Sequence, residues 1–155
     1  MFAQAVIQAD AEIGPFEAIL GHSMGGSANV IALSEGLQCD KVVLISSPSS
    51  IEGVLKRFAR YIGLPQKSTE NFIQKIGDNV GRSAESLNVA ELIQSVSSKG
   101  LIIHDQDDIE VPHSDAVAIK ENWKGAKLIS TSGYGHRWII RQADVWGSIL
   151  EFIES

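Results

Sequence analysis

The chain has 155 residues, of which 44% are hydrophobic and 21% charged, and its formal net charge at pH 7 is −6. This balance excludes an intrinsically disordered chain, and the acidic charge makes nucleic acid an unfavourable partner. No apolar run approaches the ~18 residues of a membrane span, and the single cysteine, Cys39, excludes an intramolecular disulfide. We therefore expect a soluble cytoplasmic domain with no membrane span and no nucleic-acid partner.

The hydrophobic pattern predicts strands that alternate with helices. Apolar residues at helical spacing predict a first helix over 2–13, which Gly14-Pro15 ends. Runs of apolar and β-branched residues then predict strands at 16–23, 41–46, 100–104 and 126–131. Helices are predicted over 27–35, 112–125 and 138–154. This alternation is typical of α/β proteins with a parallel sheet flanked by helices.

The last predicted helix has an apolar stripe at helical spacing that we expect to face the core. The stripe consists of Ile139, Ala143, Trp146, Leu150 and Ile153.

Residues 49–98 interrupt the alternation of strands and helices. They have helical periodicity and no strand candidate, so we expect a helical insertion between two parts of a core, 1–48 and 99–155. Asn88 and Glu91 have the spacing of a capping box that opens a short helix. The basic residues Lys56, Arg57 and Arg60 are expected to form a solvated helix face.

The segment Gly21-His22-Ser23-Met24-Gly25-Gly26 matches the pattern G-x-S-x-G at a predicted strand–turn–helix junction. In this setting the turn is tight, small residues are needed two before and two after the serine, and the serine oxygen projects from the sheet edge. The pattern also arises by chance in glycine-rich turns, but the junction favours a nucleophile at Ser23. The backbone N–H of Met24 would then be an oxyanion donor, and His22 is expected to pack.

A serine nucleophile needs a base and an orienting acid, and in a parallel sheet both are expected after strand ends. The segment Ser132-Gly133-Tyr134-Gly135-His136 follows the fourth strand, and an acidic run, His104 to Pro112, follows the third. A calcium loop is the alternative for this run, but Ile109 and Glu110 stand where such a loop needs an oxygen ligand and glycine.

These three segments together resemble the α/β-hydrolase superfamily. GHSMGG resembles its nucleophile elbow, HDQDDIEVP its H-G-x-x-D-x-x-V-P acid loop, and GYGH its histidine loop. The resemblance implies that Ser23 is the nucleophile, Asp108 the acid and His136 the base, with residues 49–98 as the variable cap. It implies no cofactor and no metal.

The acid loop departs from the family pattern at Asp105, where the family usually has glycine, while Asp107 falls on a variable position. The sequence leaves open which aspartate pairs with His136, and the distance of each carboxylate from the imidazole decides it. We expect Asp105, Asp107 and Glu110 to be solvated, and His104 to be a strand-end packing residue.

The resemblance also implies that the chain corresponds to the C-terminal part of such a fold, because the family has several strands before the elbow strand. The strand at 16–23 would then have a bare edge. Three explanations are open: the chain is a fragment of a longer hydrolase, it comes from a truncated reading frame, or a partner or a second copy of the chain covers this edge. The function implied is a serine hydrolase that cleaves a small carboxylic ester or thioester through an acyl-enzyme. Its activity would be impaired by the missing N-terminal part, which supplies the second oxyanion donor in the family. The alternatives are a non-catalytic binding or assembly domain and an acyltransferase.

Overall fold

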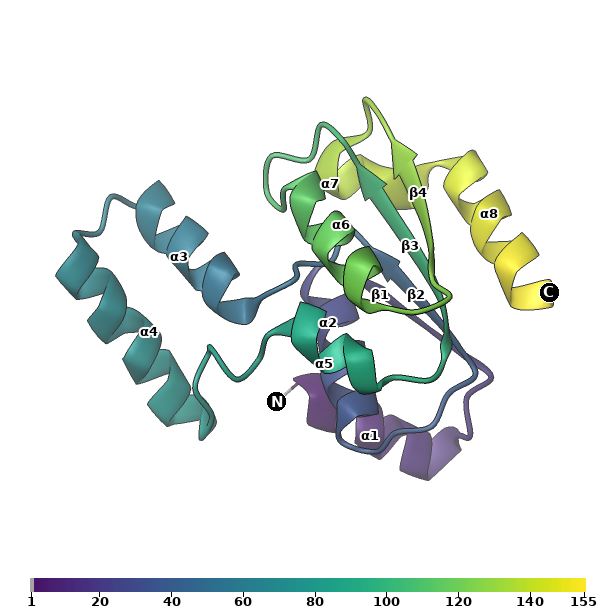
Figure 1. The fold of residues 1–155 in the computed structure, drawn as a ribbon, viewed down its shortest axis with the longest axis horizontal. Coiled ribbons are helices and arrows are strands. Elements are labelled where there is room, and N and C mark those ends of the chain that lie inside the picture. Colours follow the sequence, from purple (N-terminus) through teal and green to yellow (C-terminus); the bar gives the residue numbers. More distant parts are fainter. Residues whose placement is uncertain (1) are drawn as a thin grey trace.

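The structure, a computed structural model that describes residues 2–155, contains a four-stranded parallel sheet (Figure 1). The strands are β1 (Ala18–His22), β2 (Lys41–Ile45), β3 (Lys99–Asp105) and β4 (Lys127–Thr131). Their order in the sheet is β1-β2-β3-β4, and each neighbouring pair is parallel. The predicted α/β class is confirmed, and each strand falls within two residues of its predicted bounds.

Helices cover both faces of this sheet. They are α1 (Phe2–Ile13), α2 (Met24–Ser34), α3 (Ile51–Tyr61), α4 (Gln66–Val80), α5 (Val89–Leu92), α6 (His113–Asn122), α7 (Gly135–Trp138) and α8 (Ala143–Glu154), with short 3₁₀ turns η1 (Ile93–Ser95) and η2 (Ile139–Arg141).

The core consists of two layers, one on each face of the sheet. Because side chains alternate along a strand, Val42 and Leu44 of β2 point to one face and Val43 and Ile45 to the other. The first layer packs under α1, α2, α5 and α6, and the second under η2 and α8. All four residues are buried, as the continuous apolar run of β2 predicts.

Strand β1 lies at one edge of the sheet, since within residues 2–155 it pairs with β2 alone. Ile19 packs into the first layer, whereas Leu20, which points to the other face, is 38% exposed. Along this edge an apolar groove of about 650 Å³ runs between α1, β1 and α2. Its covering by a partner or a second copy remains a prediction.

The segment 49–98 contains α3, α4, α5 and η1. The α3–α4 pair extends away from the sheet (Figure 1), whereas α5 packs against α2 and α6. Two ion pairs hold the α3–α4 pair to the body of the molecule. Arg57 of α3 donates to Asp115 of α6 at 3.1 Å, and Arg82, just after α4, pairs with Glu35 at the end of α2. Arg57 is therefore not part of a solvated face, which corrects that expectation.

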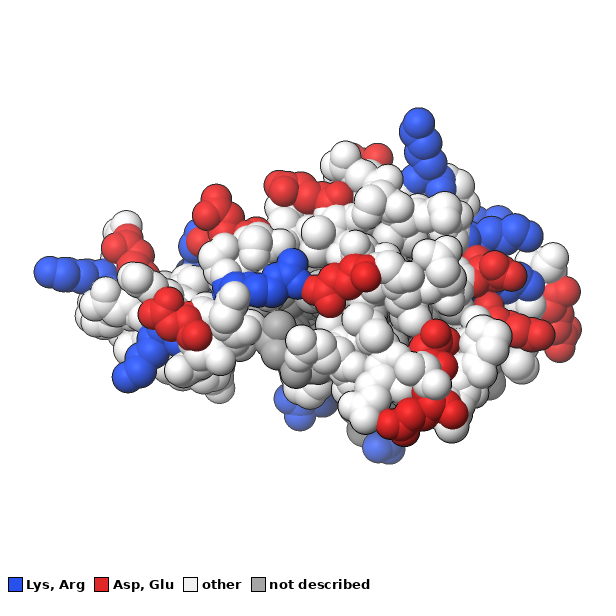
Figure 2. Space-filling model, turned by 90° about the horizontal axis from the view of Figure 1, so that it is seen from below, with Lys and Arg blue, Asp and Glu red and all other residues white. Residues whose placement is uncertain are grey.

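Charged side chains of both signs are interspersed on the face seen in Figure 2, including over the α3–α4 pair. Among residues 2–155, no helix combines the length and the hydropathy that crossing a membrane requires.

Two local expectations are wrong. Asn88 precedes α5 but makes no side-chain cap to the backbone, because its amide donates instead to the Glu91 carboxylate at 2.7 Å. The single helix predicted over 138–154 is broken near Gln142 into η2 and α8. The break shifts the phase of the buried face, so that Val145 and Ile149 enter the core, while Trp146 and Leu150 are 43% and 56% exposed.

The shifted face of α8 predicts different costs for truncating two adjacent residues. We expect Ile149→Ala to lower the free energy of unfolding by about 2–5 kcal/mol, because it leaves a cavity in the second layer. Leu150→Ala, on the exposed face, is expected to cost less than about 1 kcal/mol. Urea unfolding followed by circular dichroism measures both, and equal costs would contradict the observed phase.

Candidate active site

Ser23 is the turn residue between β1 and α2. Its backbone is in an unusual conformation, with φ 54° and ψ −126°, a region that side-chain-bearing residues rarely adopt. The Ser23 N–H donates to the carbonyl of Ile45 at 2.9 Å, which holds the turn against the end of β2. The hydroxyl makes no cap to the backbone of α2, so it is available for another partner.

Two glycines of the elbow, Gly21 and Gly26, leave no space for a side chain. Only Gly21 is one of the two glycines of the G-x-S-x-G motif. A Cβ on Gly21 would lie 2.4 Å from the backbone nitrogen of Gly26, and one on Gly26 would lie 1.8 Å from Ser47 Oγ. A Cβ on Gly25 would meet no atom within 4 Å. The expectation of a required small residue two positions after the serine is therefore wrong, because the close approach to Ser47 falls one position later.

His136 stands at the second position of α7, directly after the loop that follows β4. Its Nε2 lies 3.0 Å from Ser23 Oγ, and its Nδ1 lies 2.8 Å from Asp108 Oδ2. The structure thus brings the three predicted residues into one hydrogen-bonded series from the ends of β1, β3 and β4. The aspartate that contacts the imidazole is Asp108.

Asp108 is buried and surrounded by hydrogen-bond donors. Oδ1 accepts the N–H groups of Glu110 and Val111 at 2.9 and 2.8 Å, and Oδ2 also lies 3.4 Å from His104 Nε2. Burial alone raises the pKa of Asp108, but the bonds from His104, His136 and Val111 outweigh it and hold the pKa far below its ordinary value. The carboxylate is therefore ionised at neutral pH.

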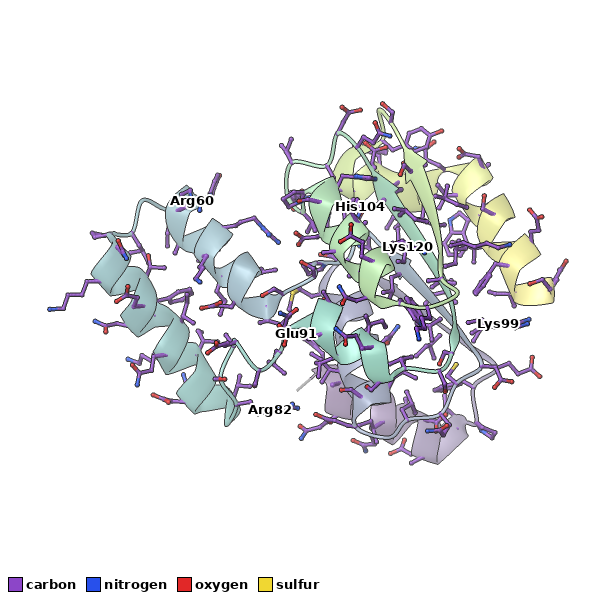
Figure 3. All side chains as sticks on the ribbon, in the orientation of Figure 1. Arg60, Arg82, Glu91, Lys99, His104 and Lys120 are labelled. Atoms are coloured by element: carbon purple, nitrogen blue, oxygen red, sulfur yellow. The ribbon has the colours of Figure 1, made fainter. Side chains whose placement is uncertain are left out.

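His104 contributes more than strand-end packing. It is fully buried (Figure 3 labels it), and its Nε2–H donates to the carbonyl of Val111 at 2.9 Å while lying close to Asp108. Its ring also meets that of His113 edge-on at 5.8 Å. A histidine four residues before the acid, at a strand end, was the signal available for this contact.

His22 also does more than pack. Its Nε2–H donates to the backbone carbonyl of His136 at 2.8 Å, and the two rings lie 4.9 Å apart. Burial lowers the pKa of His22, and the bond to the His136 carbonyl only partly opposes this effect. His22 therefore fixes the backbone that carries the His136 imidazole, and it does so as a neutral ring at neutral pH.

The three carboxylates expected to be solvated all contact the segment that carries His136. Asp105 is fully buried, and its Oδ2 accepts the Thr131 hydroxyl at 2.7 Å and the Tyr134 N–H at 3.1 Å. That expectation is therefore wrong for Asp105. Asp107 and Glu110 are exposed, as expected, but both are paired.

These two exposed carboxylates reach neighbouring parts of the same segment. Asp107 Oδ2 accepts the Ser132 hydroxyl and the Gly133 N–H, both at 2.8 Å. Glu110 forms an ion pair with Arg137 at 2.8 Å. The acid loop is thus joined to the histidine segment along its length.

Met24 is the first residue of α2, where backbone N–H groups have no acceptor within the helix. It lines a cavity of about 250 Å³ between the body of the molecule and the α3–α4 pair. Most of the other lining residues are apolar, among them Ile31, Ile51, Leu55, Ile76, Val80 and Leu87. Ser23, Asp108 and His136 do not line this cavity, which reaches the elbow through Met24, the residue next to Ser23.

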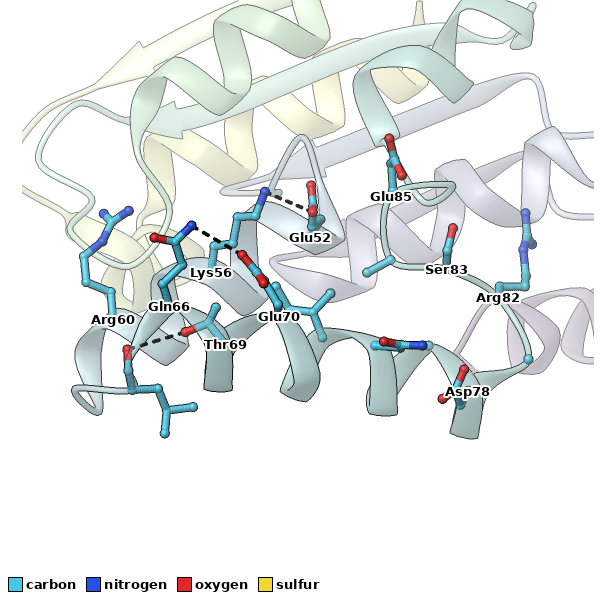
Figure 4. A pocket seen from close by; sticks show the side chains of 16 residues that line it. Glu52, Lys56, Arg60, Gln66, Thr69, Glu70, Asp78, Arg82, Ser83 and Glu85 are labelled. Atoms are coloured by element: carbon cyan, nitrogen blue, oxygen red, sulfur yellow. Dashed lines mark hydrogen bonds and ion pairs between the residues drawn. The ribbon is translucent and has the colours of Figure 1, made fainter.

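A second, more open groove of about 1250 Å³ lies between α3, α4 and the segment 81–85 (Figure 4). Its charged lining residues are Glu52, Lys56, Arg60, Glu70, Asp78, Arg82 and Glu85. Ser23, Asp108 and His136 do not line it, so this groove is separate from the hydrogen-bonded series. Among residues 2–155 no cluster of three or more His, Cys, Asp or Glu residues has a metal-binding arrangement.

No family model matches the sequence, and a search among curated proteins finds no match. Solved structures, however, are similar. A bromoperoxidase from Bacillus anthracis superposes with a TM-score of 0.70 at 17% identity, over 99% of this chain and 73% of its own. An esterase from Exiguobacterium antarcticum gives 0.68 at 16% identity, over 99% of this chain and 72% of its own.

A meta-cleavage product hydrolase from Pseudomonas fluorescens gives a TM-score of 0.68 at 19% identity, over 98% of this chain and 70% of its own. These neighbours are all α/β-hydrolases. The chain therefore has the α/β-hydrolase fold, here as four parallel strands with flanking helices, and it spans about seven tenths of the neighbours' length. The resemblance predicted from the three motifs is confirmed at the level of fold.

Substitution by alanine is expected to affect the two glycines that follow Met24 unequally. We expect Gly26→Ala to destabilise the fold by about 1–3 kcal/mol, because the new methyl group overlaps Ser47. Gly25→Ala meets no atom and is expected to leave the melting temperature within about 3 °C of the parent chain. Thermal unfolding by circular dichroism compares them, and a larger loss in Gly25→Ala would refute the packing described here.

Acid sensitivity follows from two buried carboxyls. Burial raises the pKa of Asp105, but hydrogen bonds led by that from Thr131 bring it below its ordinary value, as happens more strongly for Asp108. A lowered carboxyl pKa adds stability above the unfolded-state pKa of about 4, and this stability is lost as the pH falls toward the folded-state pKa. We expect the free energy of unfolding to fall between about pH 5 and pH 3, and to fall less steeply in Asp105→Asn. Urea unfolding at a series of pH values measures this difference, and identical slopes would count against it.

Proposed function

We propose that the chain is a serine hydrolase that cleaves a small carboxylic ester or thioester by way of an acyl-enzyme. The observation that carries the proposal is the continuous series Ser23 Oγ–His136 Nε2 (3.0 Å) and His136 Nδ1–Asp108 Oδ2 (2.8 Å), set on a strained elbow. Nucleophile, base and orienting acid in this order are the arrangement that serine acyl transfer needs. The α/β-hydrolase fold of the neighbours supports the same class of reaction.

The hydrogen bonds set the direction of proton transfer. Ionised Asp108 only accepts, so the hydrogen of the imidazole is on Nδ1 and Nε2 presents a lone pair to the Ser23 hydroxyl. Ser23 Oγ then bonds to the acyl carbon as its proton passes to His136 Nε2, and the carbonyl electron pair moves onto oxygen. The imidazolium that forms is stabilised by Asp108, which stays ionised.

Collapse of the tetrahedral intermediate breaks the bond to the leaving group, which takes the proton from His136 and departs as an alcohol or thiol. A water molecule then gives a proton to the neutral His136 as its oxygen bonds to the acyl carbon. Collapse of this second intermediate breaks the bond to Ser23 Oγ, which takes the proton back from His136 as the carboxylic acid is released. The Met24 N–H, in the first turn of α2, donates to the oxyanion in both halves of the reaction. No cofactor takes part in these steps.

The α3–α4 pair acts as a lid in this proposal. It closes the apolar cavity beside Met24, so the acyl group would lie between α2 and the lid and the cavity would select an apolar acyl chain. The ion pairs Arg57–Asp115 and Arg82–Glu35 tie the two ends of the lid, which leaves motion to the pair as a unit.

A fluorophosphonate probe tests the proposal on the intact chain. We expect the mass of the chain to increase by that of one covalently bound probe at Ser23, and Ser23→Ala to abolish this addition. Ser148→Ala, which removes a half-buried serine on α8 whose hydroxyl donates to the Asp144 carbonyl, is the matched control and should label like the parent chain. Asp108→Asn is expected to lower the labelling rate by about 10³–10⁴-fold, because the imidazole loses the partner that fixes its tautomer.

Absence of labelling in a folded, monodisperse sample would overturn the proposal and favour a non-catalytic binding domain. If labelling occurs, product analysis with an ester in the presence of a competing alcohol or amine separates hydrolysis from acyl transfer. If the transfer product predominates, the alcohol or amine takes the place of water in the second half-reaction.

A further inference from the structure

Asp105 stands at the end of β3, opposite Thr131 at the end of β4 in the register of the sheet. Although it is a carboxylate, it is fully buried, and among residues 2–155 no Lys or Arg side chain forms an ion pair with it. Its charge is instead balanced by hydrogen bonds. Oδ2 accepts the Thr131 hydroxyl and the Tyr134 N–H, and Oδ1 accepts the Asp107 N–H at 3.0 Å.

The segment that Asp105 holds is one that its own sequence leaves loose. Gly133 and Gly135 both have positive φ, 86° and 61°, and they flank Tyr134 just before His136. Glycine at such positions allows the turn but adds conformational freedom that must be restrained by other contacts. The Tyr134 N–H donates directly to Asp105, so the restraint acts two residues from the imidazole.

We propose that Asp105 is a positioning residue, which locks the 131–135 segment to the end of β3 and thereby sets where the His136 imidazole stands between Ser23 and Asp108. This inference rests on the proposed function, in which His136 is the base. Asp105 acts through backbone and hydroxyl contacts, because the imidazole itself is bonded to Asp108 and not to Asp105. The site therefore uses two buried aspartates, one on the ring and one on the segment that carries it.

Position matters here because two hydrogen bonds of 2.8 and 3.0 Å must be kept at the same time on one rigid ring. A displacement of about 1 Å in a reacting group can cost about 10²-fold in rate. Loss of Asp105 removes three hydrogen bonds and leaves the Thr131 hydroxyl and the Tyr134 N–H without their acceptor. Residues 132 and 133 are then held by the exposed Asp107, whose bonds solvent competes for, while His22 still bonds the His136 carbonyl.

The test compares Asp105→Gly, Asp105→Asn and the control Glu121→Gln, which neutralises an exposed carboxylate on α6, outside the acid loop and the histidine segment. Two quantities are measured on each folded chain: the fluorophosphonate labelling rate, and the low-field proton NMR signal of the His136 Nδ1–H bonded to Asp108. We expect Asp105→Gly to label about 10–100-fold more slowly and to lose or broaden that signal. Asp105→Asn retains an acceptor oxygen for the segment, so it should recover part of both, and Glu121→Gln should match the parent chain within about twofold.

A parent-like rate and a parent-like signal in Asp105→Gly would overturn the proposal, as would an equal loss in Glu121→Gln. If Asp105→Gly does not fold, Asp105→Asn decides by the same two measurements. If the parent chain does not label at all, the proposed function fails, but the Nδ1–H signal still reports whether Asp105 positions His136. The two failures are therefore distinguishable.

Discussion

The imidazole of His136 is hydrogen-bonded to two partners at once, so the rest of the structure must hold Ser23 and Asp108 within reach of the same ring. Nε2 reaches Ser23 and Nδ1 reaches Asp108, although the three residues follow three different strands. They meet because all four strands are parallel, so that their carboxyl ends share one edge of the sheet. Since the ring is rigid, a shift of any one strand end breaks a bond at another.

The local part of this arrangement could be predicted from the sequence. Buried strands, the strand–turn–helix setting of Ser23 and the glycine-flanked His136 are patterns within a dozen residues, and parallel topology then places their ends together. The resemblance to the family's acid loop placed the acid on Asp108, but the departure at Asp105 left the partner of His136 open, and only the structure places Asp108 beside the imidazole. Fold class and the meeting of the three side chains therefore followed from periodicity, spacing and one topological rule.

Contacts between distant segments could not be predicted in this way. Arg57 is paired with Asp115, 58 residues away, and Asp105 with Thr131, 26 residues away. From the sequence alone, such charged residues are expected to lie at the surface. Only the folded loops show which hydrogen-bond donors face their carboxylates. The predicted buried face of the last helix was wrong for a related reason. The break near Gln142 depends on how η2 and α8 pack on the sheet, and it places Val145 in the core.

The acid loop has a constraint of its own, since four carboxylates occur between residues 105 and 110. Close like charges oppose one another's ionisation, yet hydrogen bonds keep the pKa of both Asp105 and Asp108 below the ordinary value. Many of the donors come from residues 131–137, so the histidine segment stabilises the charges of the acid loop while those charges fix the segment. Each loop therefore stabilises the other. A glycine in place of Asp105 would leave the sheet intact and remove the buried link of this mutual support, so the geometry at His136 depends on more than its own two hydrogen bonds.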